Sequence, residues 1–497
     1  MKNNLPIEFF EMIIIGAGPS GIAAALIACQ HYSSVLLIDE SAQAGGQVFR
    51  APSPALRINK PSSDLIHANQ LRQQLASSSV ITWFNHRVWQ VESVNAHFIV
   101  SSYSANHQLK NSESTSQSPN KLFFARAPQL IVASGAQEKI FPVPGWTKPG
   151  VMGLAAATVL LKSEKILPGQ NIVVAGTGPL LLLVANEIIN AGGKITAIVD
   201  LNSPWQWLKS IKSVFRNLKN GLKGIRWIIK IYRQRIPFFH RHTLIEINGK
   251  DSVNQVILAP VNRNWQADFK QPKLIKADTV CLGHGLLPAI EIPQLLNVKH
   301  YFNVNFNSWC PQTDSAQRTN IKNLYLCGDG CGIQGADAAP LSGKIAALSA
   351  LLDAKKINLD NYLQQYTPLK KKLDSISQFT AAMNRLTAFK QGLLSLLKPD
   401  TIICRCENID TQTIQAAIAA GNTTLNSLKA ATRCGMGACG SRFCRETISY
   451  LIANQTQKPR TAIKPASCRP PIRPIPIQAV VDNFNYRDLP IPEPAPE

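Results

Sequence analysis

Acidic residues are scarce in this sequence, and it has no long apolar run free of turn-forming residues. Its 52 Lys and Arg outnumber 30 Asp and Glu, which gives a formal net charge of +22. Residues 166–186 are uncharged and long enough to span a bilayer, but glycine, proline and asparagine interrupt them. They predict a strand, a glycine turn and a helix start rather than a membrane helix. Glu8 and Glu11 stand where a secretion signal would be apolar, so we expect a cytoplasmic protein.

Cysteine is also sparse, and it is unevenly placed. Eleven cysteines in 497 residues are too few for a disulfide-stabilised secreted fold. Five of them lie between Cys404 and Cys444. An odd total with such local clustering favours a reducing compartment and a metal site. A chain of this length is expected to form about two to four domains.

The shortage of acidic residues is complete between Asp200 and Glu246. That segment contains ten basic residues: Lys209, Lys212, Arg216, Lys219, Lys223, Arg226, Lys230, Arg233, Arg235 and Arg241. Apolar and aromatic residues alternate with them, which predicts basic amphipathic helices. We favour a helix pair that packs on its own domain. Peripheral contact with an anionic membrane, on the cytoplasmic face, is the second interpretation, and we expect no nucleic-acid partner.

The stretches "MIIIGAGPSG" and "VLLIDE" near the start carry the pattern of a βαβ dinucleotide-binding unit. Gly16, Gly18 and Gly21 form the motif GxGxxG. The first glycine permits a tight turn, the second lets the backbone approach a pyrophosphate, and the third lets helix and strand pack closely. The second strand is expected to end at Asp39, whose carboxylate would accept hydrogen bonds from ribose hydroxyls, with Glu40 as the alternative.

A second copy of the pattern is "NIVVAGTGPLLLLVANEIINAGGKITAIVD". Gly176 and Gly178 match the first two glycines, but Leu181 occupies the position of the third. A bulky side chain there is expected to push the helix from the strand. We therefore expect a Rossmann-like domain whose nucleotide binding is in doubt. If it bound a dinucleotide, Asp200 at the strand end would repel a 2′-phosphate and favour NAD.

Two later segments are expected to complete the first domain. "LIVASGA" predicts a strand that ends in a tight turn at Gly135. "NLYLCGDG" predicts another strand, followed by Gly328 and Asp329, where a carboxylate is placed to bond a flavin's ribityl hydroxyl. The second unit is thus inserted in the first. The fold class we expect is α/β, with two Rossmann-like domains and a small helical module after them.

This organisation resembles that of flavoproteins with two dinucleotide-binding domains, over residues 12 to about 350. The stretches "GGQVFR" and "PGWTKPGV" narrow the resemblance to the alpha-type subunits of opine oxidases, hydroxyproline dehydrogenases and hydrogen cyanide synthase. The resemblance implies FAD. It implies FAD contacts at Gly16, Gly18, Pro19, Ser20, Gly21, Asp39, Glu40, Gly46, Gln47, Gly135, Gly328 and Asp329.

A disulfide reductase is excluded, because such enzymes need a redox cysteine pair beside the flavin. No cysteine follows closely after Gly46, and residues 160–275 contain none. Cys327 and Cys331 bracket Asp329 as C-x3-C, and we interpret them as small packed residues.

Four cysteines near the C-terminus form the strongest remaining signal. Cys404 and Cys406 make a C-x-C pair, and Cys439 and Cys444 make a C-x4-C pair. Helices are expected between the two pairs and after the second, so the cysteines would lie in loops. Four thiolates suit zinc or an iron–sulfur cluster, and C-x-C is a tight bite for one zinc ion. The pattern resembles the bacterioferritin-associated-ferredoxin-like 2Fe–2S domain, which implies these four as ligands.

Two further features of this module are open at the level of sequence. Cys434 is a fifth cysteine, which either substitutes as a ligand or is an inert buried thiol, and we favour the latter. Four arginines lie close to the ligands in sequence: Arg405, Arg433, Arg442 and Arg445. They either favour the reduced cluster or only make the module soluble.

The resemblance implies an electron-transferring FAD and 2Fe–2S subunit of an amino-acid, imino-acid or opine dehydrogenase, or of a hydrogen cyanide synthase-like complex, with a quinone or other acceptor. The expected partners are a second flavoprotein subunit that carries the substrate site and a small ferredoxin-like subunit. No catalytic residue can be assigned, because no constellation of His, Glu or Arg suggests a substrate site. The alternative is an NADH:acceptor oxidoreductase that acts alone.

The expected domains follow the motifs in order. They are an FAD-binding domain at 1–160 and 275–350, an NAD(P)-binding-like domain at 161–274 with a basic helical insertion at 204–243, a helical linker at 351–398, the 2Fe–2S domain at 399–456 and a Pro-rich tail at 457–497.

Overall fold

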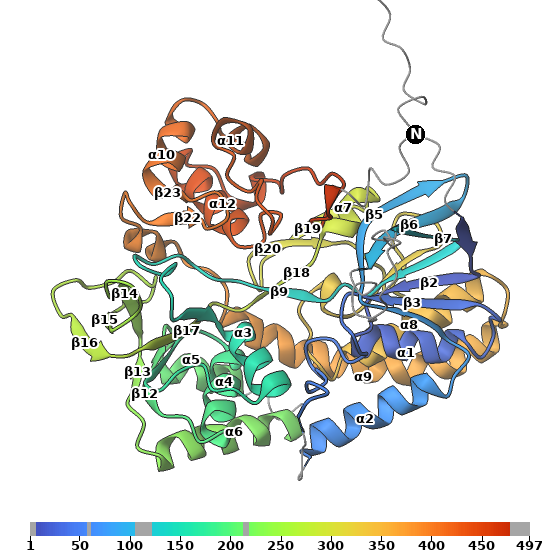
Figure 1. The fold of residues 1–497 in the computed structure, drawn as a ribbon, viewed down its shortest axis with the longest axis horizontal. Coiled ribbons are helices and arrows are strands. Elements are labelled where there is room, and N and C mark those ends of the chain that lie inside the picture. Colours follow the sequence, from blue (N-terminus) through green and yellow to red (C-terminus); the bar gives the residue numbers. More distant parts are fainter. Residues whose placement is uncertain (1–5, 57–60, 105–121, 212–217, 478–497) are drawn as a thin grey trace, which may run out of the picture.

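The computed structural model describes residues 6–56, 61–104, 122–211 and 218–477 (Figure 1). A five-stranded parallel sheet, in the order β21-β8-β2-β3-β4, organises the first domain. Its strands are β2 (Met12–Ile15), β3 (Val35–Asp39), β4 (Ile81–Phe84), β8 (Gln129–Val132) and β21 (Leu324–Leu326). The central strand "MIII" is buried at every position, as expected of a strand covered on both faces.

Helices α1 (Pro19–Ala28) and α8 (Ala339–Asp353) pack closely against each other beside this sheet (Figure 1). Both are rich in alanine, and a Cβ atom on Gly343 would lie 2.0 Å from the carbonyl oxygen of Ser20. Small residues therefore permit the close approach. Two further helices, α2 (Ser63–Ala76) and α9 (Leu359–Arg385), flank this pair.

The other face of the first sheet is covered by a second sheet in the order β1-β7-β6-β5. Its strands are β1 (Ile7–Phe9), β5 (His86–Val94), β6 (His97–Ser104) and β7 (Leu122–Ala127). Ile13 and Leu36 from the first sheet meet Phe98 and Val100 from the second in one apolar cluster. The first domain is thus a three-layer structure with helices on one side and strands on the other.

The second domain is built on another five-stranded parallel sheet, in the order β10-β17-β11-β12-β13. Its strands are β10 (Val151–Gly153), β11 (Ile172–Gly176), β12 (Ile195–Asp200), β13 (Phe238–His240) and β17 (Thr279–Gly283). Helices α3 (Leu154–Val159), with its π-helical continuation Leu160–Glu164, and α4 (Pro179–Asn190) accompany the sheet. An antiparallel sheet follows, of β14 (His242–Asn248), β15 (Gln255–Pro260) and β16 (Lys273–Lys276).

The expected boundaries of the inserted domain, at 161 and 274, are too narrow. Both β10 and β17 fall outside that range, yet they pair with each other in the second sheet. The chain passes between the domains in the antiparallel pair of β9 (Ala136–Glu138) and β18 (Leu286–Pro288). Short strands with no motif of their own left no mark in the sequence.

The basic segment forms α5 (Pro204–Ile211) and α6 (Leu218–Arg233), while Lys212, Phe215 and Arg216 lie outside the described residues. Ile231 is fully buried, and Trp227 and Ile228 pack against the core of the second domain. The favoured interpretation, a helix that packs on its own domain, is confirmed for this face of α6. Among the described helices, none has the length and apolar character needed to cross a membrane.

After α9 the chain enters the C-terminal module through a short 3-10 helix, Gln391–Leu396. The module contains β22 (Ile402–Cys404), β23 (Ile409–Asp410), α10 (Thr411–Ala419), α11 (Leu425–Thr432) and α12 (Cys444–Gln455). Asp410 caps α10 by accepting a hydrogen bond from the N–H of Thr413, as its position before the helix predicts. Figure 1 shows the module next to the second domain and close to β18.

Candidate functional site

The first glycine loop has the geometry that its sequence requires. Gly16 has φ +104°, and a Cβ atom there would lie 2.4 Å from the carbonyl oxygen of Ala133. A Cβ atom on Gly21 would lie 1.8 Å from the carbonyl oxygen of Gly16. Beside Gly18 there is open space, with no atom within 4 Å of its Cβ position. The N-terminus of α1, which no side chain caps, therefore faces room for a phosphate.

Other residues expected at the cofactor gather around this loop. Pro19 is the first residue of α1, and Ser20 is buried beside Gly328, whose Cβ position lies 3.0 Å from the Ser20 hydroxyl oxygen. Gly46 has φ +57°, and its Cβ position lies 2.8 Å from the Cα of Gly18. A side chain at Gly46 would therefore collide with the phosphate loop.

The acid at the end of β3 is Asp39, and it faces the loop. Its carboxylate accepts hydrogen bonds from the N–H of Ala17 at 2.6 Å and of Ser41 at 2.7 Å. Burial raises the pKa of Asp39, and these two bonds oppose that rise. Glu40, the alternative, is exposed and pairs with Arg87 at 3.8 Å.

Gln47 is also exposed, and its side chain accepts a hydrogen bond from Arg50 at 3.2 Å. The geometry favours Asp39 over Glu40 as the ribose ligand and gives no support to Gln47 as a direct contact.

The turns expected to hold a flavin ring and ribityl chain lie together. Gly135 has φ +68° with no atom within 4 Å of its Cβ position, and it is next to Gly330 of the 3-10 helix Gly328–Cys331. Asp329 accepts hydrogen bonds from the N–H groups of Gln334 and Gly335, both at 2.8 Å and both on Oδ1. Desolvation raises its pKa.

Cys327 and Cys331, which flank Asp329, are packed in apolar clusters, as expected. Burial raises the pKa of Cys327 to about 12 and raises that of Cys331 well above its ordinary value. Both thiols are therefore protonated and poor nucleophiles.

In the second domain, the glycine loop is covered by the chain itself. The carbonyl oxygen of Leu386 accepts hydrogen bonds from the Thr177 hydroxyl at 2.9 Å and from the Asn202 amide at 3.0 Å. A Cβ atom on Gly178 would lie 2.4 Å from Cγ2 of Thr387. The residues just after α9 thus occupy the place beside the loop where a dinucleotide's phosphates would lie.

The acid of the second domain is committed to the protein as well. Asp200 is fully buried and accepts hydrogen bonds from the Trp207 indole at 2.6 Å and from the N–H of Asn202 at 3.0 Å. Burial raises its pKa to about 7. Leu181 is also fully buried in the core. Sequence reasoning did not find the covering segment, because Leu386 and Thr387 lie more than 200 residues further on and carry no motif.

The five cysteines of the C-terminal module gather as a group of three, Cys404, Cys434 and Cys444, and a pair, Cys406 and Cys439. The Sγ atoms of Cys404 and Cys444 lie within 4.8 Å, and the side chains of Cys406 and Cys439 interact. With Cys434 set aside, two pairs remain, and each takes one cysteine from the C-x-C loop and one from the C-x4-C loop. Two pairs of sulfurs are what the two irons of a 2Fe–2S core require, since each iron takes two protein ligands.

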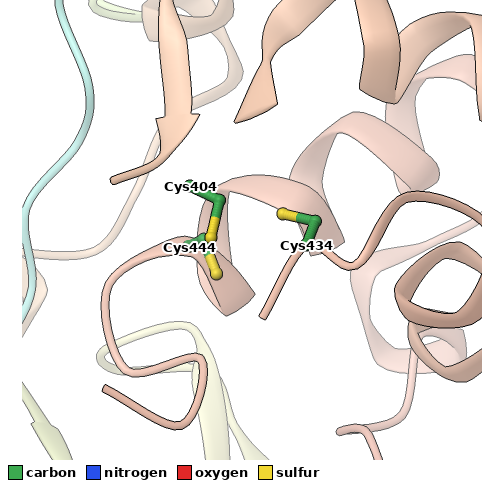
Figure 2. A group of neighbouring side chains, drawn as sticks. All are labelled: Cys404, Cys434 and Cys444. Carbon is green, nitrogen blue, oxygen red and sulfur yellow. The ribbon is translucent and has the colours of Figure 1, made fainter. Parts of the chain in front are cut away.

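The fifth cysteine lies beside one of these pairs. The Sγ atom of Cys434 is within 4.8 Å of those of Cys404 and Cys444, and Figure 2 shows it directed toward them from the end of α11. The pKa of the Cys404 thiol is lowered to about 2, because the thiols of Cys434 and Cys444 donate to its sulfur. The N–H groups of Gly435 and Glu407 add to this. A buried thiolate with several donors is a good metal ligand.

Close contacts between the cysteine loops explain why the segment "GMG" has glycine at 435 and 437, which the sequence alone did not show. A Cβ atom on Gly437 would lie 2.2 Å from Cβ of Cys406, and Gly435 has φ +88° close to Ser441 and Cys444. Both glycines let the two cysteine loops converge.

Two parts of the chain match models of known protein families. Residues 10–343 match the model for pyridine nucleotide-disulphide oxidoreductases. The chain belongs to the pyridine nucleotide-disulphide oxidoreductase family. Residues 402–454 match the BFD-like [2Fe-2S] binding domain. These matches, together with the glycine loops and the paired cysteines, confirm an FAD-type oxidoreductase fold followed by a 2Fe–2S domain.

Relatives of this oxidoreductase cover nearly its whole length. Hydrogen cyanide synthase subunit HcnB of Pseudomonas protegens is 29% identical over 474 residues, which are 94% of this chain and 96% of the relative. An opine oxidase subunit of Rhizobium meliloti is 30% identical over 476 residues, which are 94% of this chain and 86% of the relative. The expected resemblance to these subunits is confirmed.

Among solved structures, L-proline dehydrogenase from P. horikoshii superposes with a TM-score of 0.67 and 19% identity, over 96% of this chain and 81% of that one. Thioredoxin reductase of T. acidophilum has a TM-score of 0.51 and 20% identity, over 70% of this chain and 99% of that one. These likenesses show the fold. The shorter reductase lacks a counterpart for much of the remaining chain.

The residues present fit both groups. Gly16, Gly18, Gly21, Asp39 and Asp329 would hold FAD, which accepts two electrons at once and releases them singly. Cys404, Cys406, Cys439 and Cys444 would hold a 2Fe–2S cluster, a one-electron carrier.

Proposed function

We propose that this chain is the electron-transferring subunit of a complex that oxidises amino acids, imino acids or opines, or of a hydrogen cyanide synthase-like complex, and passes the electrons to a quinone or another acceptor. The observation that carries the proposal is the pairing of an FAD-type fold with a cluster module docked on it. A two-electron carrier next to a one-electron carrier suits stepwise delivery of electrons.

The relatives support a role as one of several subunits. Hydrogen cyanide synthase and opine oxidase are both represented by chains named as subunits, and this chain spans 96% and 86% of them. We infer that a second flavoprotein subunit carries the substrate site. We infer that a small ferredoxin-like subunit is a further partner of the complex.

The alternative, an NADH:acceptor oxidoreductase acting alone, has little support. It needs the second domain to bind a dinucleotide. The Leu386 carbonyl is an acceptor, and it already takes the hydrogen bonds of Thr177 and Asn202 beside the glycine loop. A phosphate, also an acceptor, would have to displace it.

A cytoplasmic location at the membrane surface is supported by α6, which lies at the edge of the molecule (Figure 1). One side of the helix is exposed and apolar: Leu222, Ile225, Ile229 and Tyr232 are 40–55% exposed. The exposed Arg226 and Arg233 lie beside this stripe. Apolar residues flanked by cations suit the interface of an anionic bilayer, where a quinone acceptor would be reached.

The test is to express this chain alone and together with the second flavoprotein subunit that the proposal requires. We expect the complex, and not the single chain, to reduce an artificial dye with an amino acid, imino acid or opine as donor. Dye reduction by the purified single chain with NADH, at a rate similar to that of the complex, would refute the proposal and favour the alternative.

A further inference from the structure

Helix α12 joins the cluster module to the first domain at its very first turn. Cys444, expected to be a cluster ligand, is the first residue of α12. The next residue, Arg445, donates from Nη2 to the carbonyl oxygen of Pro288 at 3.1 Å. The one after it, Glu446, accepts a hydrogen bond from the Ser308 hydroxyl at 3.1 Å. The two side chains that follow the expected ligand Cys444 therefore form hydrogen bonds with two different strands.

Both strands border the turns assigned to the flavin. Pro288 is the last residue of β18, and its neighbour Ala289 donates to the carbonyl oxygen of Gly135 at 3.1 Å. Ser308 begins β20 (Ser308–Pro311), which, like β18, lies against the 3-10 helix that contains Asp329. The route from Cys444 to Gly135 thus runs through one side chain and one residue of β18.

A second arginine, Arg442 in the loop just before α12, contacts the same stretch of the first domain. Arg442 Nε lies 3.1 Å from Glu291 Oε1, with both side chains largely buried. Glu291 is the first residue of α7 (Glu291–Leu295), three residues after Pro288. Arg442 and Arg445 are therefore docking residues and do not merely make the module soluble. Arg405 and Arg433, by contrast, are exposed.

The buried charge around Arg445 is not balanced. Arg445, Arg460 and Lys139 are cations with little exposure, and Glu446 is the one buried carboxylate described in contact with them. Three cations against one anion leave an excess of two positive charges. Burial lowers the pKa of Lys139 to about 8, so this amine remains largely protonated near neutral pH.

Neighbouring groups do not remove this excess. His284 is neutral, since burial lowers its pKa to about 3. The Nε groups of Arg445 and Arg460 are buried and have no hydrogen-bond partner. A fold that leaves such donors unsatisfied gains no stability from them, which is an argument for a role in function.

We propose that Arg445 is a positioning residue that docks the cluster on the flavin-side strands and raises the cluster's reduction potential. The inference rests on the proposed electron-transfer function. Uptake of one electron changes the core and its four thiolates from a charge of −2 to −3, with no bond formed or broken. Buried positive charge, poorly screened by water, stabilises the −3 state more than the −2 state.

The experiment is a potentiometric titration of the purified full-length protein with dithionite, followed by electron paramagnetic resonance of the reduced cluster. Arg445→Gln should lower the midpoint potential, because one buried cation is lost. Glu446→Gln should raise it, because the buried anion in contact with Arg445 and Arg460 is lost while the amide oxygen still accepts from Ser308. Arg445→Lys, which keeps the charge, should stay closer to wild type than Arg445→Gln.

Arg405→Gln is the matched control. Arg405 stands between two expected ligands in sequence, yet it is exposed, so its loss should move the potential less than that of Arg445. Shifts in the same direction for Arg445→Gln and Glu446→Gln would mean general disruption and would overturn the proposal. So would an unchanged potential in Arg445→Gln with full iron content. Because the titration uses no substrate or partner, these outcomes are independent of whether the proposed complex is the right one.

Discussion

Thr387 fills the space beside Gly178 so closely that a Cβ atom on the glycine would lie 2.4 Å from the threonine methyl carbon. Gly178 has φ +91° and precedes α4, the place where a Rossmann domain presents its helix N-terminus to a pyrophosphate. The contact joins the second domain to the end of α9. The dinucleotide fold is thus used here to anchor the segment that leads to the cluster module.

From this contact we expect that neither NADPH nor NADH reduces the flavin rapidly. The Leu386 carbonyl and the Thr387 side chain occupy the phosphate position, and the buried Asp200 disfavours a 2′-phosphate. The measurement is the absorbance of the flavin after anaerobic mixing with each nucleotide at micromolar concentration. Thr387→Gly is the control: it removes the methyl group but leaves the Leu386 carbonyl, so it should remain unreactive. Rapid bleaching of the wild type by NADPH would show that the loop is accessible.

Removing the carboxylate of Asp329 should weaken FAD binding. A lost charge-assisted hydrogen bond that leaves donors unpaired costs roughly 1–3 kcal/mol. Asp329→Ala should therefore bind FAD about 5- to 150-fold more weakly, as measured by titration of the apoprotein with FAD.

Asp329 also orders its own loop through Gln334 and Gly335, so a second variant separates the two roles. Asp329→Asn keeps an acceptor for these N–H groups but loses the charge. Weak binding in both variants supports direct contact with FAD. Weak binding in Asp329→Ala alone assigns the effect to the loop, and unchanged affinity in both shows that the residue is wrongly assigned.

Cys434→Ser should retain the cluster, whereas serine at Cys404, Cys406, Cys439 or Cys444 should abolish or distort it. The four would supply two sulfurs to each iron of a bound cluster, and a hydroxyl is a hard ligand in place of a soft thiolate. Iron and sulfide content should be two each in Cys434→Ser. Because Cys434 contacts Cys404 and Cys444, the electron paramagnetic resonance spectrum of the reduced cluster in Cys434→Ser should nevertheless differ from that of wild type. Loss of iron in Cys434→Ser, with retention in Cys444→Ser or Cys439→Ser, would show that Cys434 is a ligand.

The sequence was sufficient for features that repeat a local pattern. The strand Met12–Ile15 and the strand end at Asp39 both follow from residues within a few positions of each other. The C-x-C and C-x4-C motifs were recognised in the same way, whereas the approach of Cys404 to Cys444 and of Cys406 to Cys439 was not predicted. The spacing of the motif determines local geometry, so neighbouring residues carry the information.

Contacts between distant segments could not be predicted in this way. The Leu386 carbonyl over Thr177 joins residues 209 positions apart, and Arg445 meets Pro288 across 157. Neither Leu386 nor Pro288 belongs to a motif. Each takes part through its backbone carbonyl, which every residue type has. The proximity of Cys434 to two ligands was likewise invisible, because it depends on how α11 ends.

The contribution of Asp200 to the free energy of unfolding should fall as the pH rises from about 4 to about 7. Its pKa is raised from 3.8 to about 7 in the folded protein by burial. In this window the folded state holds a proton that the unfolded state has released, so raising the pH favours unfolding. The full contribution is on the order of 4 kcal/mol, present below pH 4 and lost above pH 7. Asp200→Asn does not titrate, so the difference in melting temperature between wild type and variant should change in favour of the variant as pH rises. A difference that is constant with pH would mean that Asp200 is ionised throughout.

Vesicle binding tests the exposed stripe on α6. We expect the protein to sediment with vesicles that contain phosphatidylglycerol and to remain in solution with pure phosphatidylcholine, and salt should weaken the binding. Arg226→Gln with Arg233→Gln should cost about 2 kcal/mol, roughly a 30-fold loss in affinity, since each cation contributes about 1 kcal/mol near an anionic surface.

Ile225→Gln with Ile229→Gln should also release the protein from anionic vesicles, because these side chains are 40% and 46% exposed and would enter the interface. The matched control is Leu274→Gln, which changes an apolar residue that is 55% exposed and belongs to β16 rather than to α6. The Leu274→Gln variant should bind anionic vesicles like wild type, because binding depends on the stripe of α6 and not on exposed apolar surface elsewhere. If the two isoleucine substitutions leave sedimentation unchanged, or if wild type binds neutral vesicles equally well, α6 is not a membrane-binding surface.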